Sequence, residues 1–146
     1  MALKLGRNAK IYYNAGSYAS PSWTEITLAR DVTTNLDSET ADADHRGAGN
    51  FGADVVVRLK AGVDFELIWD TANAVFLVLL NAFTNMSGVE FLVLDGPVGT
   101  VGSRGVRATC SVSKFTRTEP LRGVQLAQVS IMPTYADNPA AWYTVT

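Results

Sequence analysis

Short apolar runs separated by turn residues recur along most of the chain, which has 146 residues. Extended strands are predicted at 9–16, where "KIYY" precedes a turn, and after Pro21 in "SWTEITLARDVT". The stretches "DVVVRLK" and "VDFELIWD" are rich in β-branched and aromatic residues, and only Ala61-Gly62 separates them. This spacing predicts a hairpin. In its second strand Val63, Phe65 and Leu67 share one face, because side chains alternate along a strand.

The second half of the chain continues the strand pattern. Strands are predicted at 89–96, from 106 towards 120, and at 124–135, with a turn over 119–123 between the last two. The alternation shifts near Ser113-Lys114, which predicts a β-bulge. "GPVGTVGSRG" is rich in glycine, but it lacks the Lys-Ser/Thr pair and the following helix that a phosphate-binding loop needs. It is therefore interpreted as a hairpin loop.

One helix is predicted, over about 70–86. Asp70 or Thr71 can cap its start, since a short side-chain oxygen accepts from the free first-turn amides, and Gly88 can end it. Apolar residues surround nearly the whole helix, whereas a surface helix has a polar back. It should pack on its own sheet and on a neighbouring subunit. The expected fold is mainly β: a β-sandwich or barrel of antiparallel strands with this flanking helix, in one domain (1–146).

The segment 33–52, "TTNLDSETADADHRGAGNFG", interrupts the apolar pattern and is predicted to be a long polar loop. Asp42, Asp44 and His45 could offer ligands to a metal, but there is no second histidine and no EF-hand spacing. A solvated acidic loop is the favoured interpretation. A Ser–His–Asp site would have to use His45, and no Gly-x-Ser-x-Gly elbow is present. Cys110 lies in an alternating run and should be buried. Neither an enzyme nor a cofactor is expected.

Composition narrows the function classes further. Hydrophobic residues make up 47% and charged residues 18%, with a formal net charge of −2. Charge below the usual quarter suggests that something else covers part of the surface, and the balance does not favour nucleic-acid binding. A single cysteine excludes an intrachain disulfide. The N-terminus lacks a signal-peptide apolar region, and "AVFLVLL" is too short to span a bilayer. We expect a soluble protein that acts inside a cell or in a particle assembled there.

Charges are unevenly placed. Five acids and no base lie between Asp31 and Asp44, whereas five bases and one acid lie between Arg104 and Arg122. These runs can be solvated faces of one molecule, or they can register a repeated contact between copies. Repeated head-to-tail contacts make rings when the rotation closes and filaments when it does not.

Several segments, in this order, resemble tail tube proteins of long-tailed bacteriophages. They are "W-x-E-I-x-x-A-R-D-V-T" (23–33), "D-S-E-T-A-D-x-x-x-R-G" (37–47), "D-F-E-L-I-W-D" (64–70), "V-E-F-L-V-L-D-G" (89–96), "R-G-V-R-A-T-C-S-V-S-K-F-T-R-T-E-P-L" (104–121) and "V-S-I-M-P-T" (129–134). The match runs from about Lys10 to Thr134. Its specificity lies in the order and spacing, since no segment alone is diagnostic.

The resemblance implies a structural subunit that forms hexameric rings, which stack into a hollow tube for DNA delivery from capsid to host. It implies a virion tail location after assembly in the bacterial cytoplasm. Implied partners are further copies of the chain and tape-measure and terminator proteins, with DNA only as passing cargo and no membrane span. The long polar segment would reach adjacent subunits. The predicted subunit and ring contacts are Asp37, Glu39, Asp42, Asp44, His45, Arg46, Arg104, Arg107, Lys114, Arg117, Arg122, Phe76, Leu80 and Phe83.

Two other functions stay open on the sequence. A tube subunit of a contractile injection or type VI-like secretion system would share the fold but carry protein cargo. A monomeric β-sandwich ligand-binding module, for example for sugars, would expose aromatic residues along a groove: Tyr12, Tyr13, Tyr18 and Trp23.

Overall fold

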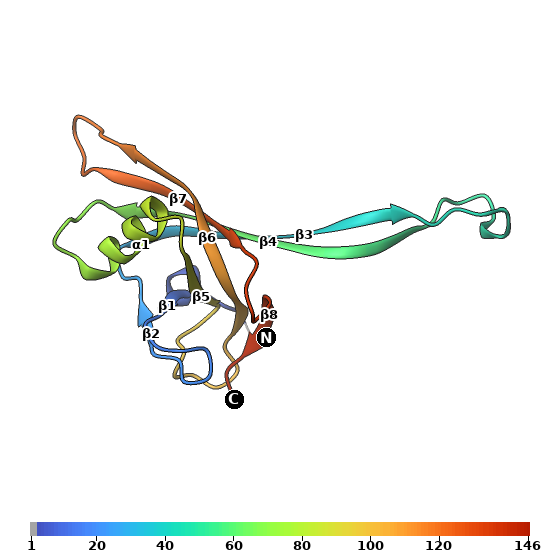
Figure 1. Cartoon of the computed structure of the whole chain (residues 1–146), viewed down its shortest axis with the longest axis horizontal. Coiled ribbons are helices and arrows are strands. Elements are labelled where there is room, and N and C mark those ends of the chain that lie inside the picture. Colours follow the sequence, from blue (N-terminus) through green and yellow to red (C-terminus); the bar gives the residue numbers. More distant parts are fainter. Residues whose placement is uncertain (1–2) are drawn as a thin grey trace.

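The computed structural model describes residues 3–146 and is dominated by antiparallel strands around one α-helix (Figure 1). The elements are η1 (Gly6–Asn8), β1 (Lys10–Asn14), β2 (Trp23–Glu25), β3 (Ala29–Asp42), η2 (Arg46–Ala48), β4 (Asp54–Ile68), α1 (Ala74–Thr84), β5 (Gly88–Leu94), β6 (Arg104–Thr118), β7 (Leu126–Pro133) and β8 (Ala141–Thr144). The mainly β class with a flanking helix is thus confirmed.

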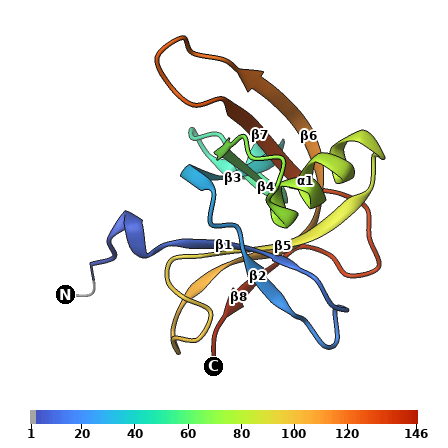
Figure 2. The ribbon, with the colours of Figure 1, turned by 90° about the vertical axis from the view of Figure 1, so that its left-hand side faces the viewer.

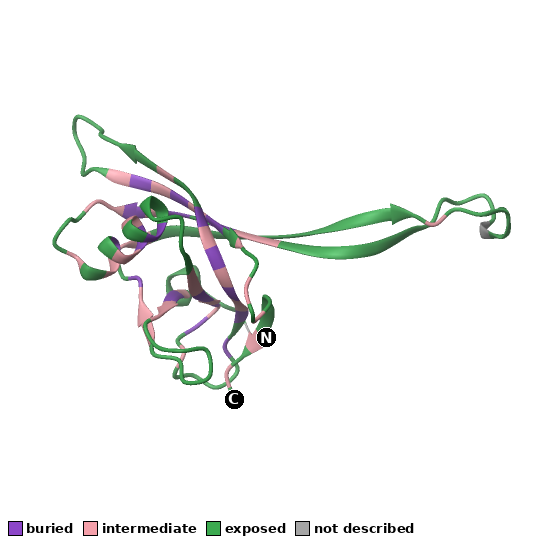
Figure 3. Ribbon diagram, viewed as in Figure 1, coloured by how far each residue is buried: buried purple, intermediate pink, exposed green. Residues whose placement is uncertain are grey.

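All of these strands belong to a single sheet. Its order is β2-β1-β5-β6-β7-β4-β3, and β8 pairs with the first part of β6. The sheet curls, so that its two ends diverge and α1 lies in the bend (Figure 2). The main core joins Ile11 of β1, Phe65 of β4, Phe91 of β5 and Phe76 of α1. A smaller cluster on the other face of β1 and β5 contains Tyr12, Leu92 and Leu94. Burial is concentrated in this body (Figure 3).

β3 and β4 pair far beyond the body and form a projecting hairpin, which we call the arm (residues 34–62; Figure 1). The predicted hairpin at Ala61-Gly62 is wrong, because β4 runs unbroken from Asp54 to Ile68. The predicted loop 33–52 is also wrong over its first half, because residues 33–42 belong to β3. Both errors have one cause. The segments before and after Ala61-Gly62 pair with β3, with Asn35 opposite Gly62, and not with each other.

The helix is shorter than predicted at both ends. It begins after Asn73, whose side chain accepts from the Phe76 amide at 3.1 Å, and not after Asp70 or Thr71. It ends at Thr84, with Asn85 as its C-cap followed by Met86 at φ 54°, so Gly88 is not the terminator and begins β5 instead. The Asn73 side chain satisfies a free first-turn amide in the way expected of a cap, three residues further along the chain than Asp70, which accepts from the Ala72 amide instead.

Three local predictions are confirmed. The register of β6 against β7 shifts between Val112 and Lys114, as expected for a bulge. Cys110 is buried at 4% exposure. Residues 95–103 connect the antiparallel strands β5 and β6, and strand, not helix, follows them.

Candidate assembly surfaces

The arm has one apolar face and one charged face. Directly paired residues of an antiparallel ladder point to the same side, and sides alternate along each strand. One face carries Leu36 opposite Ala61 and Ser38 opposite Leu59. The register shifts at Val57, which has no partner on β3. Val56, the next residue towards the tip, pairs with Thr40 and therefore lies on the same face as Leu36 and Leu59. Leu36, Val56 and Leu59 are 60%, 57% and 81% exposed.

The opposite face of the arm is held by polar contacts. Glu39 accepts from Arg58 at 3.1 Å and lies 3.8 Å from the Lys60 ammonium. Nearer the body, the Asn35 amide donates to Asp64 at 2.9 Å. Exposed pairs of this kind contribute little stability. A two-stranded ribbon with this much free apolar surface is marginal in water on its own.

The tip of the arm contains the predicted Asp42, Asp44, His45 and Arg46. Each of the first three accepts a local backbone hydrogen bond: Asp42 from the Asp44 amide, His45 Nδ1 from the Gly47 amide at 3.0 Å, and Asp44 from Ala53. Their oxygen and nitrogen atoms therefore shape the turn that joins β3 to β4. In the part of the chain that the structure describes, no group of three His, Cys, Asp or Glu residues is arranged to hold a metal ion.

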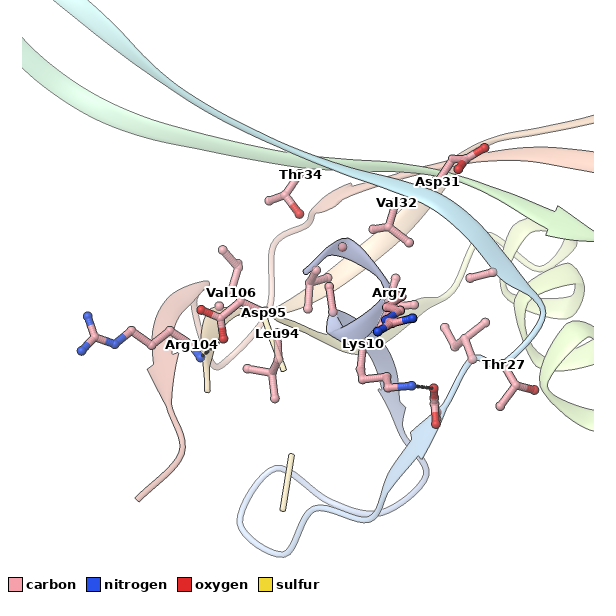
Figure 4. Close-up of a pocket in the computed structure, with 18 of the residues that line it drawn as sticks. Arg7, Lys10, Thr27, Asp31, Val32, Thr34, Leu94, Asp95, Arg104 and Val106 are labelled. Carbon is pink, nitrogen blue, oxygen red and sulfur yellow. Dashed lines mark hydrogen bonds and ion pairs between the residues drawn. The ribbon is translucent and has the colours of Figure 1, made fainter. Parts of the chain in front are cut away.

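A groove lies between the root of the arm and the body (Figure 4). Its volume is about 700 Å³. Its floor is one register row across four strands: Ile11 of β1 pairs with Val93 of β5, Val93 with Val106 of β6, and Val106 with Trp142 of β8. Trp142, at the open end, is 62% exposed.

The apolar face of the arm forms the roof of this groove. Val32, Thr34 and Leu36 line it from β3. A bulge sets this geometry at the arm's root, where Asp31 and Val32 together oppose Phe65, and Asp31 has φ 49°. Groove floor and arm face are thus one continuous apolar surface. Charged groups stand along its margin: Arg7, the Lys10–Glu25 pair at 3.2 Å, and Asp95, which accepts from the Arg104 backbone amide.

α1 carries a second exposed apolar surface. Phe76, predicted to contact a neighbour, is fully buried in the subunit's own core and packs edge-on against Trp69 at 4.9 Å between ring centroids. Leu80 is half-buried, and Phe83 is 37% exposed while its ring stacks on Phe115. Leu77, 39% exposed, adds to the outer side. Leu80 and Phe83 therefore stay available to a partner, and Phe76 does not.

The five basic residues of 104–122 do not form one patch. Arg104 borders the groove, Lys114 lies on the far sheet face, and Arg122 is in the exposed turn between β6 and β7. Arg117 pairs with Glu119. The five bases therefore do not make up one surface that could receive the acidic segment of a neighbour.

Arg107 departs most from its predicted role. It pairs with Glu90, and its guanidinium also donates to the Tyr18 carbonyl at 2.7 Å. The Tyr18 and Trp23 rings lie 4.0 and 5.1 Å from its central carbon. This cation–π arrangement fastens the 15–22 loop to β5 and β6. Of the aromatic residues named for the ligand-binding alternative, Tyr12 is buried at 6%, Tyr13 is half-buried, and Tyr18 and Trp23 lie against Arg107.

Sequence reasoning missed a polar sheet face that the helix leaves uncovered. Two register rows cross β6, β7, β4 and β3 there: Lys114, Ser130, Asp64 and Thr33, then Thr116, Gln128, Glu66 and Arg30. Gln128 donates to Glu66 at 2.8 Å, and Ser130 donates to Asp64. The alternation of "VDFELI" and "AQVSIM" was the signal for this face. The sequence does not show that these two segments pair with each other, as β4 and β7 do.

No helix within residues 3–146 has both the length and the apolar character needed to cross a membrane.

Comparisons with known proteins place this fold. Neither a protein-family model nor a curated protein sequence matches the chain. Solved structures do. A chain from the tail of an empty gene transfer agent particle, refined helically with C6 symmetry, has a TM-score of 0.74 at 13% identity and covers 99% of this chain and 100% of its own. The SPP1 tail tube has a TM-score of 0.71 at 10% identity, over 89% of this chain and 75% of that one.

A third similar structure comes from the baseplate of the anti-feeding prophage, symmetrised six-fold. Its TM-score is 0.58 at 8% identity, and it covers 94% of this chain and 91% of its own. The chain therefore has the tail tube protein fold, along nearly its whole described length.

Proposed function

We propose that the chain is a structural subunit of a phage-type tail tube. Its copies would form rings, hexameric in keeping with the C6 and six-fold symmetries of the similar structures. The rings would stack into a hollow conduit for DNA, with the protein located in the virion tail. The observation that carries the proposal is the fold likeness, which extends over almost all of the chain. On this proposal the protein is not an enzyme.

The distribution of apolar surface supports self-assembly. A soluble monomer rarely leaves a large contiguous apolar surface open. Here the arm and groove present one, and α1 presents another on the opposite side of the body. Two different surfaces on one chain suit a heterologous contact, which repeats from copy to copy and builds rings or filaments.

The uncovered polar face is the surface we assign to the channel. Once apolar surfaces are used in contacts between subunits, this face of β6, β7, β4 and β3 is the one left to water. Its carboxylates, Asp64 and Glu66, accept hydrogen bonds from neighbours in the sheet. A basic wall would hold DNA phosphates by counterion release. The two register rows of this face carry as many carboxylates as bases, the bases being Arg30 and Lys114, and so have no net positive charge.

A tube subunit of a contractile injection or secretion machine is the second candidate, favoured by the likeness to the anti-feeding prophage baseplate. Neighbouring genes separate the two. Capsid and tape-measure genes beside this one support a phage-type tail, and sheath and ATPase genes support the machine.

Negative-stain electron microscopy of the purified full chain, at rising protein concentration, tests self-assembly. Rings of uniform diameter and tubes built from them are the expected result. Monomers and irregular aggregates alone, under all conditions tried, would overturn the proposal.

A further inference from the structure

We infer that the apolar face of the arm, together with the groove at its root, holds helix α1 of a second copy of the chain. The inference rests on the proposed function and names the contact through which neighbouring subunits would bind. It starts from the receiving surface. Between residues 34 and 40 of β3 and between residues 59 and 63 of β4, the side chains on this face carry no charge.

The second step is the identity of the occupant. The uncharged face of the arm disfavours charged partners, because each charge would lose its water without gaining a counter-charge. The charged groups of the groove stand along its margin. From Thr71 to Val89 the chain contains no charged residue, and this stretch includes all of α1. Its outer side exposes Leu77, Phe83 and, after the helix, Met86.

Several other exposed apolar residues of the described chain lie among charges. Leu121 sits between Glu119 and Arg122, Leu5 lies between Lys4 and Arg7, and Phe51 lies on the tip that also carries Arg46 and Asp54. Each would bring a charge onto the apolar face if it docked there. Uncharged stretches elsewhere also expose apolar residues: Val101 in the loop 96–103, and Val124, Met132 and Tyr135 in 123–136. These stand singly or are spread over β7 and the loops on either side of it. The region around α1 is the uncharged stretch whose exposed apolar residues lie on, or directly after, one helix.

Dimensions agree with this assignment. The strands of the arm extend for roughly 30 Å beyond the body at the usual rise per residue. A helix of 11 residues is about 16 Å long. The arm can thus span the helix of a neighbour along its full length. Within one molecule the contact is not made, since the arm projects away from α1 (Figure 1).

Cysteine cross-linking tests the contact. Leu59→Cys on the apolar face is mixed with Leu77→Cys on α1, and the mixture is treated with a short bis-methanethiosulfonate reagent after assembly. Cys110 is buried, so single variants serve as background. The matched control is Lys60→Cys, one residue along β4 but on the charged face. We expect a covalent dimer from Leu59→Cys with Leu77→Cys, and its loss with Lys60→Cys.

Microscopy of the same samples keeps this inference distinct from the proposed function. Tubes in which Leu59→Cys fails to couple to Leu77→Cys, or couples instead to Leu121→Cys, would overturn the arm–helix contact and leave the tube subunit standing. Equal coupling from Lys60→Cys would also overturn it. Absence of rings and tubes from the wild-type chain would overturn both.

Discussion

The guanidinium of Arg107 and the carboxylate of Glu90 form an ion pair that is nearly withdrawn from water, with side chains 14% and 11% exposed. Tyr18, Trp23 and Tyr143 surround the guanidinium. The pair joins β5 to β6 and fixes the 15–22 loop, so its role is within one subunit. Arg107, one of the predicted contact residues, therefore contributes to the stability of the subunit, as does Phe76 through its burial in the main core.

Arg107→Ala should destabilise the subunit strongly, because it leaves the Glu90 carboxylate buried without a partner. Losing one member of a buried pair costs about 3–5 kcal/mol. Arg58→Ala is the control: its pair with Glu39 is about half exposed, and exposed pairs contribute roughly 0–1 kcal/mol. Urea unfolding followed by circular dichroism measures both. Equal losses for the two variants would contradict the structural role of Arg107.

Alanine substitutions at Phe76 and Phe83 should differ in effect, the first lowering the stability of the subunit and the second impairing its assembly. Phe76 is fully buried, so Phe76→Ala should cost about 3–5 kcal/mol of unfolding free energy. Phe83→Ala removes a ring that is 37% exposed. It should unfold with a much smaller loss and yet assemble poorly. Thermal unfolding and pelleting of assembled material are the two readouts, and normal pelleting of Phe83→Ala would remove α1 from the contact.

Gly105 should not tolerate a side chain. It pairs with Leu94 across β5 and β6, and a Cβ there would meet the Val93 carbonyl oxygen and carbon, the latter at 2.6 Å. Both are backbone atoms, so neither can rotate away. Gly105→Ala should therefore give little soluble, folded protein. Gly99→Ala, in the same glycine-rich segment, meets nothing within 4 Å and should behave as wild type. Solubility and near-ultraviolet circular dichroism report the outcome.

Stability should fall in alkaline solution partly through Cys110. Burial raises the pKa of this thiol from its ordinary 9.0 to about 12. Below pH 9 both folded and unfolded chains keep the proton, so the thiol adds no pH dependence. Between pH 9 and 12 the unfolded chain loses the proton first, and the free energy of unfolding falls by at most about 1.4 kcal/mol per pH unit.

Cys110→Ala isolates this effect from the other groups that titrate at high pH. The variant should be less stable than wild type at pH 8, because a buried sulfur is removed, and the gap should narrow by pH 11. Urea unfolding at both values gives the comparison. A gap that stays constant would show that the thiol titrates normally in the folded chain.

Most of the body could be predicted from the sequence, because a strand buried on one face shows alternating apolar and polar residues. Alternating Val63, Phe65 and Leu67 indicated a half-buried strand, and the shifted alternation near Ser113 indicated the bulge. The arm is exposed on both faces, so no such pattern marks it. Its strand β3 is set by its pairing with β4, and Ala61-Gly62 looked like a turn because that partner was unknown.

The same difference separates the parts of the candidate site that could be predicted from the sequence from those that could not. Arg107 and Glu90 are 17 residues apart and face each other only because β5 pairs with β6, so their ion pair had no local signal. The groove floor likewise takes one residue from each of four strands. The apolar surround of α1 was visible in the sequence, but which of its residues face outward, Phe83 and not Phe76, depends on how the sheet curls around it.

A variant with a shortened arm tests whether the arm is needed for assembly. Leu36 and Ala61 are direct partners, so an Asn-Gly turn can join them in place of residues 37–60. No residue removed belongs to the main core or the smaller cluster. The shortened chain should therefore keep the far-ultraviolet spectrum and the cooperative unfolding of the body.

The decisive measurement is negative-stain microscopy of this variant beside the full chain, at equal concentration. Tubes from the full chain and none from the folded, shortened variant are the predicted result. Long tubes from the shortened chain would show that the arm does not join subunits, and a body that no longer folds without its arm would show that the arm belongs to the subunit's own stability.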